Sequence, residues 1–245
     1  MTVAPHKYSG LSRKYQVEKM FDNISPSYDF LNHLLSFNID KIWRKKAIAR
    51  LSRFQPVTIL DIATGTADFA IAASRLKPGK IIGVDLSDNM LSIGKKKVKR
   101  RGLSELITLR KGDSENIQYK DNSFDAVTVG FGLRNFDKLE KGLSEIYRVL
   151  NPGGALVVLE FSQPENFFFR KLYLFYLTML LPKLGHIISR NRGAYLYFPE
   201  SVLKFPYGNE FIIILEKVGF EKCEYFVQTM GIATIYICRK PNITA

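Results

Sequence analysis

The sequence is poor in the residues that build disulfide-stabilised and metal-stabilised folds. Its 245 residues include only two cysteines, Cys223 and Cys238, and three histidines. Two cysteines are too few for a disulfide framework, and their positions lack the spacing of a metal site. We therefore expect no bound metal and a reducing, cytoplasmic setting, in which disulfides are rare.

Long hydrophobic runs are also absent. No stretch reaches the length of about 18 apolar residues that a membrane-spanning helix requires, and the N-terminal segment has no apolar core of signal-peptide length. The nearest approach, Leu172 to Pro182, is short and lies between the basic residues Arg170, Lys171 and Lys183. Any contact with a membrane is therefore predicted to be peripheral.

Acidic residues are fewer than basic ones, 23 against 36, so the net charge is +13. The basic residues cluster at Lys95–Arg101 and at Arg44–Lys46. These runs are typical of solvated helix faces, or of a surface that meets nucleic acid or anionic lipid. RNA-binding proteins usually interleave such residues with exposed aromatic side chains, whereas here the aromatic residues lie apart from the lysine run. Nucleic acid is therefore not expected as a partner.

What the chain does contain is an alternation of apolar strand-like runs and helical patterns. Such an alternation predicts βαβ units and a doubly wound parallel sheet. Two final strands without a helix between them predict a closing hairpin, so the last strand should be antiparallel. The fold class is thus α/β and Rossmann-like, with a seven-stranded, mostly parallel sheet. The predicted strands are 57–62, 80–86, 106–110, 124–130, 155–161, 224–229 and 233–238, and the helices between them are 69–76, 88–100, 138–150 and 211–218.

Two further segments fall outside this alternation. Residues 1–53 carry helical stripes that Pro26 interrupts, and residues 162–208 form an aromatic-rich insertion. No linker or repeat separates them from the rest. We expect a single domain over residues 1–245 in which both segments form helical caps.

The turn after the first strand predicts a nucleotide site. Open α/β sheets bind ligands at the carboxyl ends of their strands. A dinucleotide fold needs G-x-G-x-x-G, but here Asp68 stands where the third glycine would be and would repel a pyrophosphate. A ligand with a ribose, no phosphates and an ammonium group, such as S-adenosylmethionine, suits this turn better. The candidate cofactor-binding residues are Asp61, Gly65, Asp68, Asp85, Asp113 and Ser114.

Several segments resemble the menaquinone/ubiquinone-biosynthesis C-methyltransferase family. Tyr28-Asp-Phe-Leu-Asn32, followed by Ser36 and Trp43, is similar to the family's Y-D-x-M-N…S…H…W signature, with Leu31 for methionine and Asp40 for histidine. The remaining matching segments are Phe131-Gly-Leu-Arg-Asn135, Arg148–Gly154 with Asn151 for lysine, Glu160-Phe-Ser162, and Tyr195-Leu-Tyr-Phe-Pro-Glu-Ser-Val202.

The resemblance implies a class I methyltransferase fold with S-adenosylmethionine near Thr66, Asp85 and Asp113-Ser114. It implies methylation of demethylmenaquinol, of a methoxy-polyprenyl-benzoquinol, or of both. A methyltransferase of another small aromatic substrate, and a non-catalytic partner in quinone synthesis, are the alternatives. The family turn reads G-T-G-D where this chain has Ala67. Because alanine disfavours a positive φ, we expect the turn to differ, or Ala67 to take an ordinary conformation.

The chemistry needs a quinol oxygen that loses its proton, so that a ring carbon becomes nucleophilic. Arg134 stays charged and is predicted to stabilise the phenolate or to organise water, with Asn135 orienting the ring oxygen. The alternative role for Arg134 is a structural salt bridge to an acid such as Asp137. His33 and Tyr195 are the further catalytic candidates. Tyr28, Asp29 and a water held by Arg134 and Asn135 also remain open as the base.

The substrate's polyprenyl tail needs an apolar channel. The segment from Phe161 to Leu184 is rich in aromatic residues, which predicts either a buried cap helix or an apolar lid on the bilayer. Both readings are compatible. We expect the protein at the inner face of the cell membrane, bound peripherally, with a homodimer left open.

Overall fold

The computed structural model describes residues 5, 10–36, 38–180 and 192–242. In this part of the chain, seven strands form one sheet in the order β3-β2-β1-β4-β5-β7-β6. The strands β1 to β5 are parallel, and β7 runs antiparallel to both β5 and β6. The predicted fold is confirmed. The strands are β1 (Thr58–Ile62), β2 (Lys80–Asp85), β3 (Ile107–Lys111), β4 (Phe124–Gly130), β5 (Leu150–Phe161), β6 (Glu221–Gln228) and β7 (Ala233–Arg239).

Helices cover both faces of the sheet, because successive strand residues point to opposite sides and both sides are apolar. One face packs against α2 (Ile39–Leu51), α3 (Asp68–Ala73) and α4 (Asp88–Arg100). The other face packs against α5 (Leu139–Val149) and α9 (Asn209–Val218). Ser87 caps α4, since its Oγ accepts the N–H of Met90 at 3.1 Å. Short helical turns complete the frame: η1 (Ser52–Phe54), η2 (Ser74–Leu76), η3 (Leu133–Asn135) and η5 (Thr229–Gly231).

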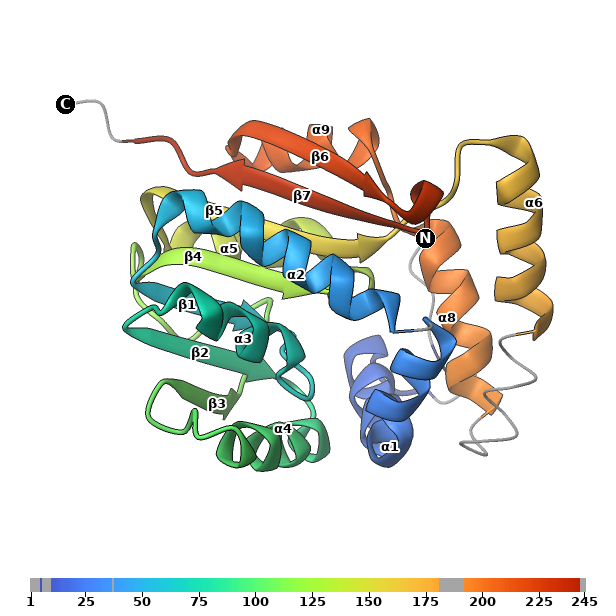
Figure 1. The fold of residues 1–245 in the computed structure, drawn as a ribbon, viewed down its shortest axis with the longest axis horizontal. Helices are drawn as coiled ribbons and strands as arrows, with labels where there is room; N and C mark the ends of the chain where they lie inside the picture. The colour runs from blue at the N-terminus through green and yellow to red at the C-terminus, as the bar shows by residue number, and fades with distance from the viewer. Residues whose placement is uncertain (1–4, 6–9, 37, 181–191, 243–245) are drawn as a thin grey trace.

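The remaining helices gather beyond the carboxyl ends of the parallel strands (Figure 1). They are α1 (Arg13–Leu35), α6 (Phe167–Phe175), a π-helical turn η4 (Tyr176–Leu180) and α8 (Arg192–Lys204). Their buried side chains form a separate hydrophobic cluster. The helices therefore lie where the sequence predicts caps. The assignment of the whole chain to one domain stays a prediction.

The sequence prediction of a break at Pro26 is wrong, because α1 continues through it. Proline has no N–H and so leaves the carbonyl of Asp22 without its helical partner. The hydroxyl of Ser25 donates to that carbonyl at 2.9 Å. Local compensation of this kind lets a helix tolerate an internal proline.

The fifth strand is longer than predicted. Residues Asn151–Gly154, expected to form a turn, belong to β5. Gly153 adopts a φ of +75° and the pairing register with β4 shifts nearby. A glycine-rich bulge therefore lets the chain pass directly from α5 into the strand.

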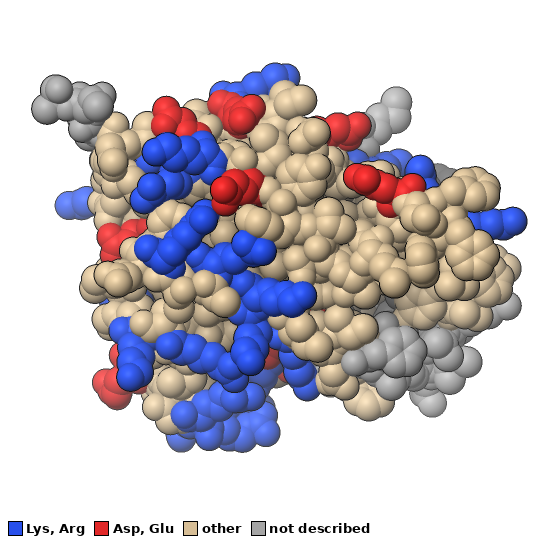
Figure 2. Space-filling view, turned by 45° about the horizontal axis from the view of Figure 1, so that its top comes forward, with Lys and Arg blue, Asp and Glu red and all other residues tan. Residues whose placement is uncertain are grey.

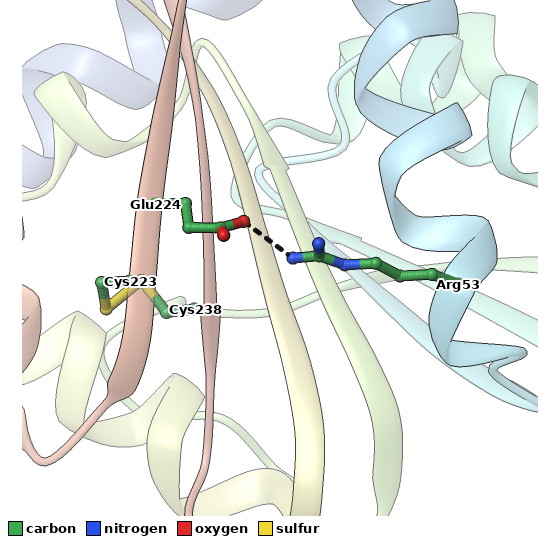
Figure 3. Close-up of a disulfide and its surroundings, with 4 residues drawn as sticks. All are labelled: Arg53, Cys223, Glu224 and Cys238. Atoms are coloured by element: carbon green, nitrogen blue, oxygen red, sulfur yellow. Dashed lines mark hydrogen bonds and ion pairs between the residues drawn. A yellow bond between two sulfur atoms is a disulfide. The ribbon is translucent and has the colours of Figure 1, made fainter.

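The two cysteines lie side by side on neighbouring antiparallel strands, a pairing that the sequence analysis does not predict. Lys222 adopts a φ of +50°, and the register between β6 and β7 shifts there. The shift brings Cys223 opposite Cys238, and the structure joins them in a disulfide (Figure 3). The adjacent residue Glu224 forms an ion pair with Arg53 at 3.0 Å on the exposed side.

On the face of the molecule drawn in Figure 2, the positive charge is concentrated in one region. Figure 2 shows the basic residues in a band over the helices α2, α3 and α4, while the surface toward α6 is largely uncharged. Within the described residues, no helix combines the length and the hydropathy needed to cross a membrane.

Candidate active site

Two cavities adjoin the carboxyl edge of the sheet. The smaller, of about 80 Å³, lies over the ends of β1, β2 and β4 and beneath α1. The larger, of about 490 Å³, is enclosed by the helices α1, α2, α6 and α8. Both are lined by Phe21, Tyr28, Phe131 and Asn135. The two cavities are therefore neighbours, with these side chains between them.

Three of the seven residues that the sequence predicts to bind the cofactor line the smaller cavity. Gly65, Asp85 and Ser114 all contribute to its wall. The two carboxylate oxygens of Asp85 accept the N–H groups of Gly65, at 2.8 Å, and of Ser87, at 2.9 Å. Burial nonetheless raises the pKa of Asp85 above its ordinary value. Each oxygen keeps a lone pair, which suits the two hydroxyls of a ribose.

Asp61 lies behind the turn and does not line the cavity. Its side chain is fully buried and accepts hydrogen bonds from the hydroxyls of Thr64 and Thr128, both at 2.6 Å, and from the N–H of Ala70 at 3.2 Å. Burial raises the pKa of Asp61 to about 6 against these hydrogen bonds. These hydrogen bonds hold the loop after β1 and the first turn of α3 in place.

Ala67 occupies the left-handed region, with a φ of +68° and a ψ of +21°. The expectation that Ala67 takes an ordinary conformation is therefore wrong, whereas the alternative, that the turn differs from the family's, stays a prediction. A methyl group at this place needs room, and Gly94 on α4 provides it: a Cβ on Gly94 would lie 3.3 Å from that of Ala67. Ala67 thus adopts a glycine-like backbone conformation.

Thr66 and Asp68 face a basic residue instead of the smaller cavity. The ammonium group of Lys97 donates to Asp29 at 2.8 Å, to the hydroxyl of Thr66 at 3.1 Å, and to Asp68. Arg44 also approaches Asp68, at 4.0 Å. This ion-pair network ties the helical caps to the turn, and Lys97 is thereby set apart from the solvated members of its basic run.

The side chain of Asp113 is held by a residue of α1. Its carboxylate accepts a hydrogen bond from Lys14 at 2.7 Å and from the N–H of Glu115 at 2.9 Å. Lys14 and Glu115 line the smaller cavity. The start of α1 therefore covers the place where the sequence predicts the adenine.

Arg134 forms a buried ion pair, but with Glu160 and not with Asp137. The Nη1 and Oε1 atoms lie 2.7 Å apart, and the side chains are 6% and 1% exposed. The same nitrogen donates to the carbonyl of Phe131. Asp137 lies instead 3.8 Å from Arg13. Arg134 is therefore fixed in the wall of the larger cavity by an acid 26 residues away.

Asn135 lies in the wall that the two cavities share. Its Oδ1 accepts the hydroxyl of Tyr197 at 3.0 Å. The guanidinium group of Arg13 donates to the carbonyls of Arg134, at 3.2 Å, of Asn135, at 3.2 Å, and of Phe136. Arg13 thus fixes the whole η3 turn from α1.

The larger cavity has an aromatic wall with a cation at each end. The rings of Phe131 and Phe161 stack with their centroids 4.4 Å apart. Arg44 lies over Phe131 at 5.7 Å, and Arg134 lies over Phe161 at 5.2 Å. Such a wall suits a flat aromatic ring that gains negative charge.

Asp40, where the family has histidine, also lines this cavity. It accepts hydrogen bonds from Arg44 and from the hydroxyl of Ser36, at 2.7 Å. The departure from the family pattern is thus accommodated by an ion pair within α2. The remaining candidates, His33 in α1 and Tyr195 in α8, have side chains outside the described residues, so their roles stay predictions.

The family is decided by comparison with known proteins. The model of the ubiE/COQ5 methyltransferase family matches residues 9–240. The chain belongs to this family.

Relatives agree over almost the full length. A demethylmenaquinone methyltransferase of Bacteroides fragilis is 45% identical over 239 residues, 97% of each chain. One of Porphyromonas gingivalis is 43% identical over 91% of each chain. A ubiquinone/menaquinone biosynthesis C-methyltransferase of Geobacter sulfurreducens is 43% identical over 92% of this chain and 88% of its own. The prediction of an S-adenosylmethionine-dependent C-methyltransferase of quinone biosynthesis is confirmed at the level of the family.

Solved structures support the fold. The [4+2]-cyclase SpnF matches with a TM-score of 0.69 at 18% identity, over 94% of this chain and 97% of its own. A methyltransferase of Thermotoga maritima, described as a possible histamine N-methyltransferase, matches with a TM-score of 0.63 at 20% identity, over 91% and 99%. These neighbours have different activities, so the ubiE/COQ5 assignment rests on the sequence relatives and not on the fold.

The structure also shows residues that the sequence could not single out. Glu160 was visible in the E-F-S motif, but nothing in the sequence connected it to Arg134. Arg13 and Lys97 carried no motif signal beyond their charge. Within the described ranges, no group of three or more histidine, cysteine, aspartate or glutamate side chains is arranged to hold a metal ion.

Proposed function

We propose that this protein transfers the methyl group of S-adenosylmethionine to a ring carbon of demethylmenaquinol. The observation that carries the proposal is that the two cavities are neighbours, with Tyr28 and Asn135 lining both. A site suited to a nucleoside at the strand ends thus lies beside an aromatic cavity with buried cations. Family membership and the names of the relatives support the same reaction.

The residues of the smaller cavity fit the cofactor. Asp85 offers free lone pairs to a ribose, and Gly65, with a φ of +55°, has open space where a side chain would stand. Gly112 and Ser114 would border the adenine. When bound there, S-adenosylmethionine supplies an electrophilic methyl group on a positively charged sulfur.

The cavity is nevertheless small for such a ligand. Its volume of about 80 Å³ lies far below the roughly 300–1,000 Å³ of ordinary ligand pockets. The first turns of α1, held by the contact between Lys14 and Asp113, must therefore move outward for the cofactor to enter. Their return would close the site over it and exclude water.

The larger cavity supplies the groups that act on the quinol. A quinol ring carbon becomes nucleophilic when its hydroxyl loses a proton. The permanent charge of Arg134 favours the ionised form, because buried charges interact strongly. Asn135, fixed by Tyr197 and Arg13, would set the orientation of the ring toward the smaller cavity. The catalytic roles of His33 and Tyr195 remain part of this proposal.

The decisive experiment offers two substrates in parallel. Purified protein is incubated in detergent with labelled S-adenosylmethionine and either reduced demethylmenaquinone or the reduced methoxy-polyprenyl-benzoquinone precursor. Label in the lipid extract with the first alone supports demethylmenaquinol as the substrate, and label with both supports a dual role. Transfer to neither, despite measurable cofactor binding, contradicts the quinol assignment.

The proposal includes peripheral contact with the inner face of the cell membrane. On α6, Phe167 is 82% and Phe168 is 71% exposed, and Arg170 and Lys171 stand beside them. An exposed apolar face of this kind costs free energy in water and marks an interaction surface. The same helix also borders the larger cavity. On α6 and the following turn η4, the residues that are both exposed and part of the cavity wall are Phe169, Leu172, Phe175 and Leu180.

This double exposure supports a bilayer as the partner of α6. The cavity, at about 490 Å³, lies within the range of ordinary ligand pockets, so a long prenyl tail must leave it. The tail would leave along an apolar rim that continues onto the exposed face of α6. Flanking Arg170 and Lys171 and the net charge of +13 favour anionic headgroups.

Vesicle sedimentation tests the membrane contact. Phe167→Asp should weaken binding to vesicles that contain anionic phosphatidylglycerol by about tenfold, since it replaces an inserted ring with a charge. The matched control is Ile213→Asp, because Ile213 on α9 is also exposed, at 51%, but lies away from α6. Equal binding by both variants would contradict the proposal that the exposed face of α6 contacts the membrane. Light scattering of the same samples would decide whether a homodimer forms.

A further inference from the structure

The hydroxyl of Tyr173 is buried without a hydrogen-bond partner. Tyr173 lies on α6, is 7% exposed and packs in the hydrophobic cluster of the caps. Its oxygen has no partner among the described residues. Buried hydroxyls without partners are rare in folded proteins, because they lose their bonds to water and gain nothing in return.

A second unpaired polar atom belongs to a residue that lines the same cavity. Arg134 uses Nη1 for Glu160 and for the carbonyl of Phe131, and its Nε is buried without a partner. Both Arg134 and Tyr173 line the larger cavity.

Both atoms are hydrogen-bond donors at neutral pH. The guanidinium Nε always carries its proton. Burial raises the pKa of Tyr173 above its ordinary value, and the opposing effect of Arg134 is smaller. Two unpaired donors in an apolar wall fit one acceptor that carries negative charge. Oxygen anions are the acceptors with which such bonds are strongest.

We propose that Tyr173 is a substrate-binding residue, whose hydroxyl donates together with Nε of Arg134 to the quinol oxygen that ionises before methyl transfer. This inference rests on the proposed function and adds a residue outside the matching segments. The two donors stabilise the quinolate, whose hydroxyl proton passes to solvent. The ring carbon then forms its bond to the methyl group while the carbon–sulfur bond breaks and its electron pair stays on sulfur. The ring proton at that carbon then passes to solvent, which restores the aromatic ring as the quinolate, and the quinolate takes up a proton from solvent to give the methylated quinol.

The variant Tyr173→Phe removes only the hydroxyl. At pH 7 its kcat should fall roughly ten- to hundredfold, the value of one hydrogen bond to a charged group. The bound quinol would then ionise less readily, so the ascending limb of the pH profile of kcat should move upward by about one pH unit or more. At alkaline pH, where the quinol ionises without help, the rate should recover.

Stability provides a readout that separates binding from structure. Because the hydroxyl has no partner in the protein alone, Tyr173→Phe should unfold at a temperature no lower than the wild type. Tyr147→Phe is the control, since Tyr147 packs against Phe220 and lines neither cavity. It should leave the pH profile unchanged.

The experiment uses the full-length protein with a short-tailed reduced demethylmenaquinone. An active wild type with an unchanged profile in Tyr173→Phe would overturn the role of Tyr173 and leave the proposed function standing. A lowered unfolding temperature would show that the hydroxyl has a structural partner, which also overturns it. A wild type without transfer would instead overturn the proposed function.

Discussion

Replacing Asp61 by asparagine should stabilise the protein near neutral pH and change its stability little near pH 4. Asp61 is fully buried, and burial raises its pKa from 3.8 to about 6. An asparagine carries no charge and preserves the contacts. Its oxygen can accept from Thr64 and Ala70, and its amide can donate to the hydroxyl of Thr128.

The sign and the size of this change in the free energy of unfolding follow from proton binding. Because the pKa is higher in the folded protein, the folded state binds more protons between pH 3.8 and about 6. The stability of the wild type therefore falls as pH rises through this window. A pKa raised by about two, at about 1.36 kcal/mol for each unit, penalises the folded state by about 3 kcal/mol. Asp61→Asn lacks this penalty.

The assay is equilibrium urea unfolding of both proteins between about pH 4 and pH 7.5. The free energy of unfolding of Asp61→Asn relative to wild type should grow by about 3 kcal/mol over this range. A difference that stays flat would refute the reasoning, since it would mean that Asp61 is not held in an environment that opposes its charge.

Asp125 provides a control of opposite sign. Burial opposes its charge, but hydrogen bonds from the backbone of Thr58, from the side chains of Asn151 and Thr58, and from Val57 hold the pKa of Asp125 below its ordinary value. Its charge therefore contributes stability that is present above the unfolded pKa and is lost as pH falls. Asp125→Asn should lose stability relative to wild type as pH rises.

Two further substitutions test how the caps and the turn depend on each other. Lys97→Met leaves Asp29 and Asp68 without their shared cation and should lower the free energy of unfolding by about 1–3 kcal/mol in urea melts, less than for a fully buried pair. The exposed neighbour variant Lys96→Met should change it by less than about 0.5 kcal/mol, and equal effects would contradict the network. Gly94→Ala would place a Cβ 2.8 Å from Leu109 and 3.2 Å from the backbone of Thr66, so thermal unfolding should show a loss of about 1–3 kcal/mol despite the better helix propensity. Ser92→Ala on the exposed side of α4 should not destabilise, and a stable Gly94→Ala would argue against close packing at the turn.

The helices and strands with a clear hydrophobic pattern could be predicted from the sequence. The run from Phe124 to Gly130 is a strand with the predicted bounds, and Asp88–Arg100 is a helix with the predicted bounds. Strands buried on both faces are continuous apolar runs, and Ser87 is a good N-cap residue. These signals are local, so one segment suffices to predict them.

The site was accessible only in part, because its decisive contacts join distant segments. The position of Asp85 at the end of a strand follows from local pattern, and the structure places it in the smaller cavity. The pairing of Arg134 with Glu160 depends on β4 and β5 lying side by side, and that of Lys97 with Asp29 depends on how α1 meets α4. Charge alone does not show which lysine of a run points inward.

The helix α6 shows the same limit most clearly. Between Phe167 and Leu180 almost every side chain is apolar, so hydropathy gives no periodic contrast and cannot orient the helix. In the structure, most side chains of α6 and of the following turn η4 are exposed, among them Phe168, Leu172, Phe175 and Met179, while Tyr173 and Leu177 are buried. The two buried residues are four positions apart, the spacing of one helix face. Under the proposed function the exposed side would meet a bilayer, and the buried side carries the hydroxyl of Tyr173, which has no partner among the described residues. A lipid substrate requires both faces at once, because its tail must remain in an apolar phase while its ring reaches a polar group.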